Sequence, residues 1–166
     1  MGPHGPVRRF SLTPEWTDAH STVHAIRSDP TDGGSVDDTD AVVALWRECG
    51  LTRPWNDPYA DIERKLTTQP DLFLVGETDA GVVASAMVGF DGHRGWVYYL
   101  AVQPGLRGEG VGRALMAEAE RLLIERGCPK IMLMVRSTNT DVVAFYESLG
   151  YAADEVVVLG KRLIAD

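Results

Sequence analysis

One stretch of the sequence, residues 97–115, constrains the fold more than any other. It opens as an apolar, aromatic-rich run and breaks at Gln103-Pro104-Gly105. It then carries apolar residues at helical spacing, beginning with Leu115, Ala119 and Leu122. A buried strand therefore leads through a glycine-rich turn into a helix.

The turn between this strand and this helix has the properties of an anion-binding site. Gly108, Gly110 and Gly112 carry no Cβ, so backbone N–H groups can approach an anion closely, and the helix N-terminus adds about half a positive charge. The spacing excludes two common phosphate-binding loops, because the glycines alternate strictly and no Gly-Lys-Ser/Thr follows them. An Arg-x-x-Gly-x-Gly pattern over 107–112 remains. A plain strand-to-helix turn with glycines for close packing is the alternative.

Length and composition indicate one domain. The chain has 166 residues and is 45% apolar, which is enough for a single core. We assign residues 21–166 to this domain. Residues 1–20 are rich in Pro, Gly and polar residues without a sustained period, and they predict an N-terminal extension that is mobile or loosely docked.

Charge and residue usage narrow the class of function. A formal net charge of −8 disfavours binding to nucleic acid or to an anionic membrane, and it favours cationic acceptors such as amines. No apolar run is long enough to span a membrane and no leader pattern opens the chain, so we expect a cytoplasmic protein. Two cysteines cannot make a disulfide framework, and the four histidines lack ligand spacing. No metal site is predicted.

The periodicity along the chain predicts an α/β fold. Short turns connect three strand-like runs over residues 72–102, which is typical of an antiparallel meander. The strand–helix–strand crossover after it predicts that strands 96–102 and 131–135 are parallel, and the second is apolar throughout, as a central strand would be. The predicted strands are 21–27, 72–78, 82–90, 96–102, 131–135 and 155–164, and the predicted helices are 39–49, 58–67, 110–126 and 139–149.

A second segment of the sequence narrows the interpretation of the glycine turn. Residues 135–139 (Val-Arg-Ser-Thr-Asn) are followed by residues 144–151 (Ala-Phe-Tyr-Glu-Ser-Leu-Gly-Tyr), about thirty residues beyond the turn. Together the two segments resemble the cofactor-binding motifs of the GNAT superfamily of N-acetyltransferases. Residues 53–57, 91–95 and 159–163 further resemble its bacterial YpeA-like branch, and the segments near Asn139 and Tyr146 also look like those of RimI-like enzymes.

The resemblance implies a GNAT fold with bound acetyl-CoA. Its sheet would be mixed and mostly antiparallel with helices on both faces, and its parallel strand pair would splay to admit the cofactor. The backbone of Leu100, Ala101 and Val102 would bind the pantetheine arm and the acetyl carbonyl. Asn139 would contact the pantetheine or cap its helix, and Tyr146 would direct its hydroxyl at the thioester sulfur. The pyrophosphate would be wrapped by the loop Arg107, Gly108, Glu109, Gly110, Val111, Gly112 and Arg113.

Tyr146 also has a plainer interpretation. An aromatic residue beside Phe145 on an amphipathic helix is most often part of the core. Tyr146 lies at the edge of the apolar stripe formed by Val142 and Leu149, so its ring can pack while its hydroxyl projects into a cleft. Both interpretations are compatible with the sequence.

The general base for the incoming amine is not identified. Some relatives carry a glutamate on the strand before the loop, but residues 96–102 contain no carboxylate. Asp91, His93, Tyr98 and Tyr99 are near in sequence, and each has a structural explanation until it is shown within hydrogen-bond reach. Only fifteen residues follow Tyr151, so the acceptor site is either open or completed by a second subunit in a homodimer.

Two further positions have open interpretations. His24 lies in the first predicted strand and has no partner residue nearby in sequence, which favours an ordinary strand histidine. The loop with Arg53, Trp55 and Asn56 either packs on the core or supplies binding anchors.

The function predicted from these observations is acetyl-CoA-dependent N-acetylation of a primary amine by direct transfer. The acceptor, a small molecule, a protein N-terminus or a lysine, is not specified. A non-catalytic acyl-CoA-binding or sensing module is the alternative. A phosphate-binding interaction domain without CoA fits only the glycine loop.

Overall fold

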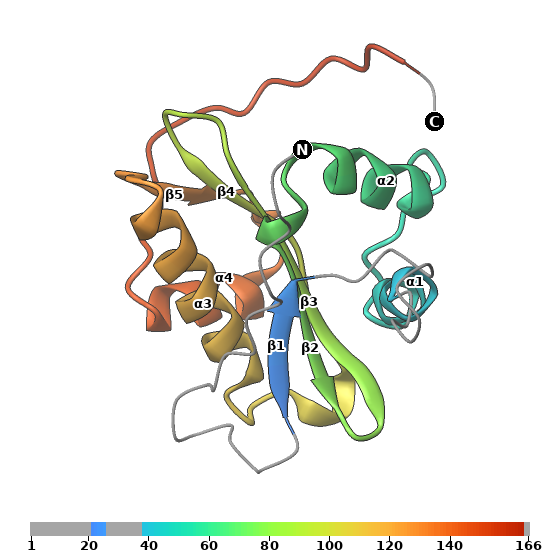
Figure 1. The fold of residues 1–166 in the computed structure, drawn as a ribbon. Helices are drawn as coiled ribbons and strands as arrows, with labels where there is room; N and C mark the ends of the chain where they lie inside the picture. The colour runs from blue at the N-terminus through green and yellow to red at the C-terminus, as the bar shows by residue number, and fades with distance from the viewer. Residues whose placement is uncertain (1–20, 26–37, 165–166) are drawn as a thin grey trace.

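The computed structural model describes residues 21–25 and 38–164 as a five-stranded sheet with helices on both faces (Figure 1). The predicted extension 1–20 lies outside the described residues, and so do residues 26–37. The strands are β1 (Thr22–Ala25), β2 (Phe73–Thr78), β3 (Gly81–Phe90), β4 (Gly95–Val102) and β5 (Ile131–Leu133). The helices are α1 (Thr39–Glu48), α2 (Pro58–Thr68), α3 (Val111–Glu125) and α4 (Thr140–Ser148), with short 3₁₀ turns η1 (Pro70–Leu72) and η2 (Pro104–Leu106).

The sheet has the predicted mixed topology. The strands lie in chain order β1-β2-β3-β4-β5, and the first three pairings are antiparallel. β4 and β5 pair in parallel, as the crossover through α3 requires. The prediction of a mostly antiparallel sheet with one parallel pair is confirmed.

Two hydrophobic clusters cover the two faces of the sheet. On one face α3 packs through Val111, Leu115 and Met116, with α4 beside it. On the other face α1 packs through Val42 and Trp46, and Ile62 of α2 joins the same cluster. The sheet is therefore the middle layer of three.

The helix boundaries follow from local signals in the sequence. Asp57 accepts a hydrogen bond from the Tyr59 amide at 2.9 Å, and Pro58 occupies the first turn of α2, where its missing N–H costs nothing. α1 ends before Gly50, whose φ of +67° is the left-handed conformation that glycine adopts without cost.

The predicted last strand, 155–164, is wrong. Residues 155–164 are exposed and belong to none of the five strands, and the segment runs from α4 past β4 towards α2 (Figure 1). Lys130, just before β5, pairs with Asp154 at 2.6 Å, just before this segment begins. Arg162 donates to Asn56 at 3.1 Å near the end of the segment. β5 lies at the edge of the sheet, but it is only three residues long, and no residue of 155–164 pairs with it. A composition rich in Val and Leu therefore does not by itself produce a strand.

β5 also differs from the prediction. It is three residues long, partly exposed and at the edge of the sheet, whereas its apolar sequence predicted a central strand. Its other apolar neighbours come from helices and from the chain after α4, so apolar residues alone did not place it inside the sheet. No helix in the described part of the chain is long and apolar enough to cross a membrane.

Candidate active site

The glycine loop lies where the sequence placed it, between the end of β4 and the start of α3. Gly108 and Gly110 have φ values of +86° and +84°, in the left-handed region that favours glycine. A Cβ added at Gly108 would meet no atom within 4 Å. Backbone conformation therefore explains both glycines. Gly110 is the N-cap of α3 without a side-chain cap, so the first N–H groups of the helix lack an intrahelical or side-chain acceptor at this end. This arrangement suits a bound anion.

The other loop residues contribute in different ways. A Cβ on Gly112 would lie 3.2 Å from Cζ of Phe145, so this glycine allows α3 to approach α4. Val111 is buried in the core, and only its backbone is available to a ligand. The exposed Arg107 donates from Nε to the Val102 carbonyl at 3.4 Å, and Arg113 is exposed beside it in sequence. Two cationic side chains therefore flank the loop.

β4 leaves β5 just before the segment predicted to bind the acyl group. The parallel pairing covers only Gly95, Trp96 and Val97 of β4, so residues 98–102 have no strand partner on that side. The predicted splay is therefore present. The side chains of Leu100 and Val102 pack towards α3 while Ala101 packs towards α1, which leaves the strand backbone as the group available on the open edge.

A β-bulge lies at the same point of β4. Ser85 pairs with Ala101 and Met87 pairs with Tyr98, so Tyr99 and Leu100 together oppose one residue of β3. Tyr99 has a φ of +50° and is the one non-glycine residue with a positive φ in the described parts of the chain. This conformation costs a bulky residue about 1–2 kcal/mol, so surrounding contacts must hold it.

Tyr146 is both a core residue and a cavity residue. Only 8% of its surface is exposed, and its ring packs edge-on against Phe145 and Tyr151 at centroid distances of 5.0 and 5.6 Å. Burial raises the pKa of Tyr146 to about 12, so the phenol is protonated at neutral pH. Asn139 is exposed at the N-cap of α4, and its side chain makes no capping hydrogen bond.

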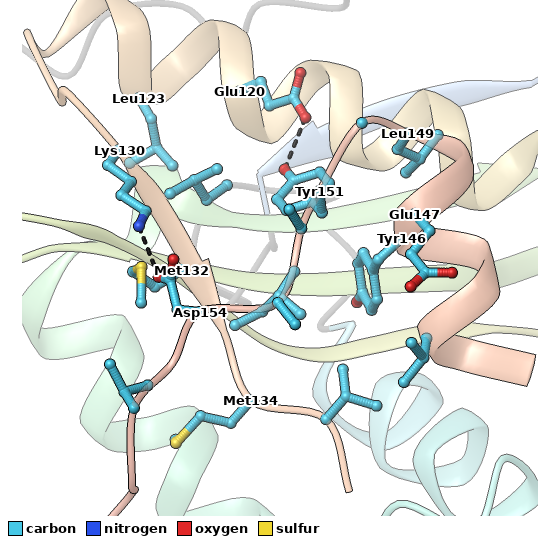
Figure 2. A pocket seen from close by; sticks show the side chains of 18 of the residues that line it. Glu120, Leu123, Lys130, Met132, Met134, Tyr146, Glu147, Leu149, Tyr151 and Asp154 are labelled. Carbon is cyan, nitrogen blue, oxygen red and sulfur yellow. Dashed lines mark hydrogen bonds and ion pairs between the residues drawn. The ribbon is translucent and has the colours of Figure 1, made fainter. Parts of the chain in front are cut away.

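A cavity of about 1040 Å³ lies between β5, the ends of α3 and α4, and the chain after α4 (Figure 2). Tyr146 and Tyr151 form part of its wall, where the Tyr151 hydroxyl donates to Glu120 at 2.7 Å. Among the predicted site residues, only Tyr146 lines this cavity; the glycine loop does not. The cavity adjoins the candidate site without marking the position of the cofactor.

The four candidate bases have other roles or other places. Asp91 accepts the amides of His93 and Arg94 and the Trp96 indole N–H, and these backbone hydrogen bonds above all lower its pKa to about 2. Asp91 and His93 lie in the turn before β4. At about 3.3 Å per residue, the start of β4 is roughly 16 Å from Leu100.

Burial raises the pKa of Tyr98, and burial with a hydrogen bond to Asp61 raises that of Tyr99 to about 12. None of the three groups with a shifted pKa is suited to accept a proton near pH 7.

The structure bears on the two interpretations of the loop between α1 and α2. Arg53 donates to the carbonyls of Gly50 and Thr52, both at 2.8 Å, and so holds the loop itself. Trp55 is 56% exposed and does not pack on the core. Nδ1 of His24 donates to the Ala25 carbonyl at 2.8 Å, and its Nε2 lies 3.1 Å from Oε2 of Glu77 in β2, which fits an ordinary strand histidine.

Sequence reasoning missed the residues around Tyr99. Trp46, Asp61 and Ser85 come from α1, α2 and β3, and all three contact Tyr99. Their spacing in the sequence has no pattern, because the contacts arise only when both helices pack on the sheet. A tyrosine in a strand run gives no signal of a left-handed backbone either.

The fold and the loop together define an acyltransferase of the GNAT type. Residues 39–151 match the model of the acetyltransferase (GNAT) family. The chain belongs to this family and is an acetyltransferase.

Bacterial relatives agree with this assignment. The chain is 55% identical over 130 residues to an acetyltransferase of Pectobacterium atrosepticum, covering 78% of this chain and 92% of the relative. It is 56% identical over 131 residues to an acetyltransferase of Sodalis glossinidius, with the same coverage of both chains.

Solved structures share the fold at low sequence identity. Ard1 from Thermoplasma volcanium aligns with a TM-score of 0.65 at 20% identity, over 80% of this chain and 83% of that one. Naa20 of Chaetomium thermophilum, solved with a bisubstrate analogue, aligns with a TM-score of 0.61 at 23% identity, over 79% of this chain and 70% of that one. These likenesses establish the fold alone.

Proposed function

We propose that the protein transfers the acetyl group of acetyl-CoA directly to a primary amine. The observation that carries this proposal is the position of the left-handed Gly108 and Gly110 loop, directly after a stretch of β4 that has left β5. One end of this stretch can bind an anion and the stretch itself can bind an extended polar chain. Acetyl-CoA has both parts, and it supplies an activated thioester when bound.

Different residues would bind different parts of acetyl-CoA. The backbone N–H groups of residues 107–113, with the guanidinium groups of Arg107 and Arg113, would bind the pyrophosphate. Backbone groups of residues 100–102, which have no strand partner on the β5 side, would bind the pantetheine amides and donate to the acetyl carbonyl oxygen. A fixed donor of this kind is worth about 2.7–4 kcal/mol in measured enzymes. Asn139, exposed at the start of α4, would contact the pantetheine.

Tyr146 would act as a hydrogen-bond donor to the thioester sulfur. With a pKa of about 12, full proton transfer to a thiolate whose acid has a pKa near 8.5 is uphill by about 3.5 units, or ~5 kcal/mol. The hydroxyl therefore stabilises charge on sulfur while the amine nitrogen bonds to the acetyl carbon and the C–S bond breaks. The amine loses one proton and the leaving sulfur gains one, with water or the acceptor itself carrying it.

The acceptor and the setting are part of the same proposal. The formal charge of −8 favours a cationic acceptor, and a cytoplasmic location would give access to acetyl-CoA. No metal takes part in the proposed reaction.

A non-catalytic acyl-CoA-binding module is the second candidate. It is favoured by the absence of a carboxylate on β4 and by the low pKa of Asp91, which leave the described site without an evident general base. Calorimetry with CoA and acetyl-CoA, together with transfer assays over a panel of amines, separates the two. Tight acetyl-CoA binding without transfer to any amine would favour the module, and no CoA binding would contradict both.

The pH dependence of kcat/KM tests how the amine is deprotonated. An alkyl amine with a pKa near 10 is about 0.1% neutral at pH 7, so a site without a base must capture the rare neutral form. We expect the rising limb of the profile to follow the acceptor, from about 8 for an α-amine to about 10 for an alkyl amine. A limb fixed near pH 6–7 for both acceptors would identify a protein base instead.

A further inference from the structure

Tyr99 is held in its strained conformation by contacts from three other elements. Its ring stacks on Trp46 of α1 with a centroid distance of 3.9 Å and an interplanar angle of 10°. Its hydroxyl donates to Oδ2 of Asp61 in α2 at 2.7 Å. Both contacts fix the side chain on the α1 and α2 face of the sheet.

The backbone of Tyr99 is held as well. Oγ of Ser85 in β3 donates to the Tyr99 carbonyl at 3.3 Å and accepts from Nε1 of Trp46 at 2.8 Å. The same indole that stacks on the Tyr99 ring therefore orients the hydroxyl that holds its carbonyl. We call Trp46, Ser85, Asp61 and Tyr99 the Tyr99 clamp.

The clamp does not itself supply acid–base chemistry. Oδ2 of Asp61 accepts from Tyr99 and from Asn56 at 3.2 Å, and Oδ1 accepts from Arg64 at 2.6 Å. Both carboxylate oxygens are therefore engaged. The raised pKa of Tyr99, about 12, keeps its phenol a donor at neutral pH. The geometry indicates a mechanical role.

The clamp holds Tyr99 within the part of β4 that has no strand partner on the β5 side. Parallel pairing of β4 with β5 ends at Val97, and the bulge follows at Tyr99 and Leu100. The orientation of the Tyr99 backbone therefore decides which way the groups of residues 100–102 point along the open edge. A relaxed, extended Tyr99 would remove the bulge and turn these groups, because side chains and backbone groups alternate along a strand.

We propose that Tyr99 is a positioning residue for acetyl transfer, and that the clamp fixes the backbone of residues 100–102 for the acetyl carbonyl. This inference rests on the proposed function for its target, and on the described contacts for the clamp. It assigns to α1 and α2 a part in the acyl-binding strand, although neither helix carries a residue of the glycine loop.

Tyr99→Phe is the direct test, with Tyr59→Phe as the matched control. Both substitutions remove a tyrosine hydroxyl that donates to an aspartate, since the Tyr59 hydroxyl donates to Asp40 at 3.0 Å. Tyr59, however, is 41% exposed on α2 and belongs to neither hydrophobic cluster of the described residues. We expect Tyr99→Phe to lower kcat roughly tenfold, with the Kd for CoA changed less than twofold, because small misplacements at a reacting centre are costly. Tyr59→Phe should change neither. Equal kcat in the two variants would overturn the proposal.

A double-mutant cycle with Asp61→Ala provides the second test. If Tyr99 and Asp61 act through one hydrogen bond, Tyr99→Phe should cost almost nothing further in the Asp61→Ala background. Independent, multiplying losses in the double variant would contradict a shared clamp.

Amide hydrogen exchange separates this inference from the proposed function. In the protein without ligand, exchange at residues 100–102 should be at least tenfold faster in Tyr99→Phe than in Tyr59→Phe. Unchanged exchange would overturn the clamp whatever the activity. Faster exchange with unchanged kcat would overturn the positioning role. A wild-type protein that binds no acetyl-CoA would overturn the proposed function, and with it the role of the clamp in binding the acetyl carbonyl.

Discussion

At the scale of single residues, Gly110 and Tyr99 have left-handed backbones for opposite reasons. Gly110 has φ +84°, a conformation that glycine adopts without cost because it has no side chain. Tyr99 has φ +50° and adopts it because its side chain is held by α1 and α2. The first feature is recognisable from sequence, since a glycine before a helix is a familiar signal. The second is not.

Gly110→Glu tests the anion-binding loop. The substitution introduces a negative charge next to the N-terminus of α3, and we expect the Kd for CoA to rise at least tenfold, about 1.4 kcal/mol. Isothermal calorimetry measures this directly.

Two control variants separate charge from backbone strain. Gly110→Ala carries the strain of the left-handed φ without the charge. Gly105→Glu carries the charge nearby, at a position with open space and no positive φ. A folded Gly110→Glu protein with unchanged CoA affinity would refute the loop assignment.

Tyr146→Phe tests the proposed donor to sulfur. The variant keeps the packed ring, so its melting temperature should stay close to that of the wild type. We expect kcat to fall on the order of 10²-fold and CoA affinity to change little, because the lost interaction strengthens only as the C–S bond breaks. Steady-state kinetics measure kcat and calorimetry measures CoA affinity; full activity would leave Tyr146 a core residue only.

At the scale of elements, local patterns predicted most of the fold. The predicted helices and the strands of the meander lie within a few residues of their predicted bounds, because capping residues, glycine stops and turn sequences act locally. The segment 155–164 was mispredicted for the same reason. Its composition favours a strand, but pairing with the short edge strand β5 depends on contacts between distant segments, which local sequence does not describe.

The residues of the candidate site also fall into two groups, those that local motifs predict and those that only long-range packing brings together. The sequence placed the glycine loop and Tyr146 on the correct elements, because both belong to motifs with fixed spacing. The sequence contained no sign that Asp61 would meet Tyr99, since 38 residues separate them and the contact needs α2 to pack beside β4.

The segment after α4 should affect association more than stability. Val157 and Leu159 are 85% and 90% exposed, so replacing both with Lys should leave the melting temperature within a degree or two. The unmodified segment is apolar, β-branched and uncovered in the described chain, and such segments promote association. We expect the double variant to remain monomeric to higher concentration in sedimentation experiments. A large loss of thermal stability would instead indicate that the segment packs against the domain in solution.

At the scale of the whole molecule, the tyrosines link stability to alkaline pH. The pKa values of Tyr99 and Tyr146 are raised to about 12, mainly by burial, and that of Tyr151 is raised by burial and by Glu120. A folded-state pKa above the unfolded value near 10 favours the protonated phenol in the fold. The stabilisation is therefore complete below pH 10 and is lost as pH rises from 10 towards 12.

Alkaline titration followed by absorbance and circular dichroism checks this expectation. Ionisation of these tyrosines should coincide with unfolding, and the Tyr146→Phe protein should lose stability less steeply above pH 10. Smooth ionisation centred at pH 10 in a folded protein would contradict it.

The order of strands in the sheet also has a consequence for how the chain folds. β2, β3 and β4 are joined by short turns, so their pairing closes small loops and can form early. β5 pairs with β4 across the whole of α3, so this pairing closes a much longer loop. Pulse-labelling during refolding should therefore show protection of β2–β4 amides before those of β5. The open edge of β4, to which we assign the acyl group, would then form in the last step of folding. Only when β5 pairs with residues 95–97 do residues 98–102 become the unpaired part of that strand.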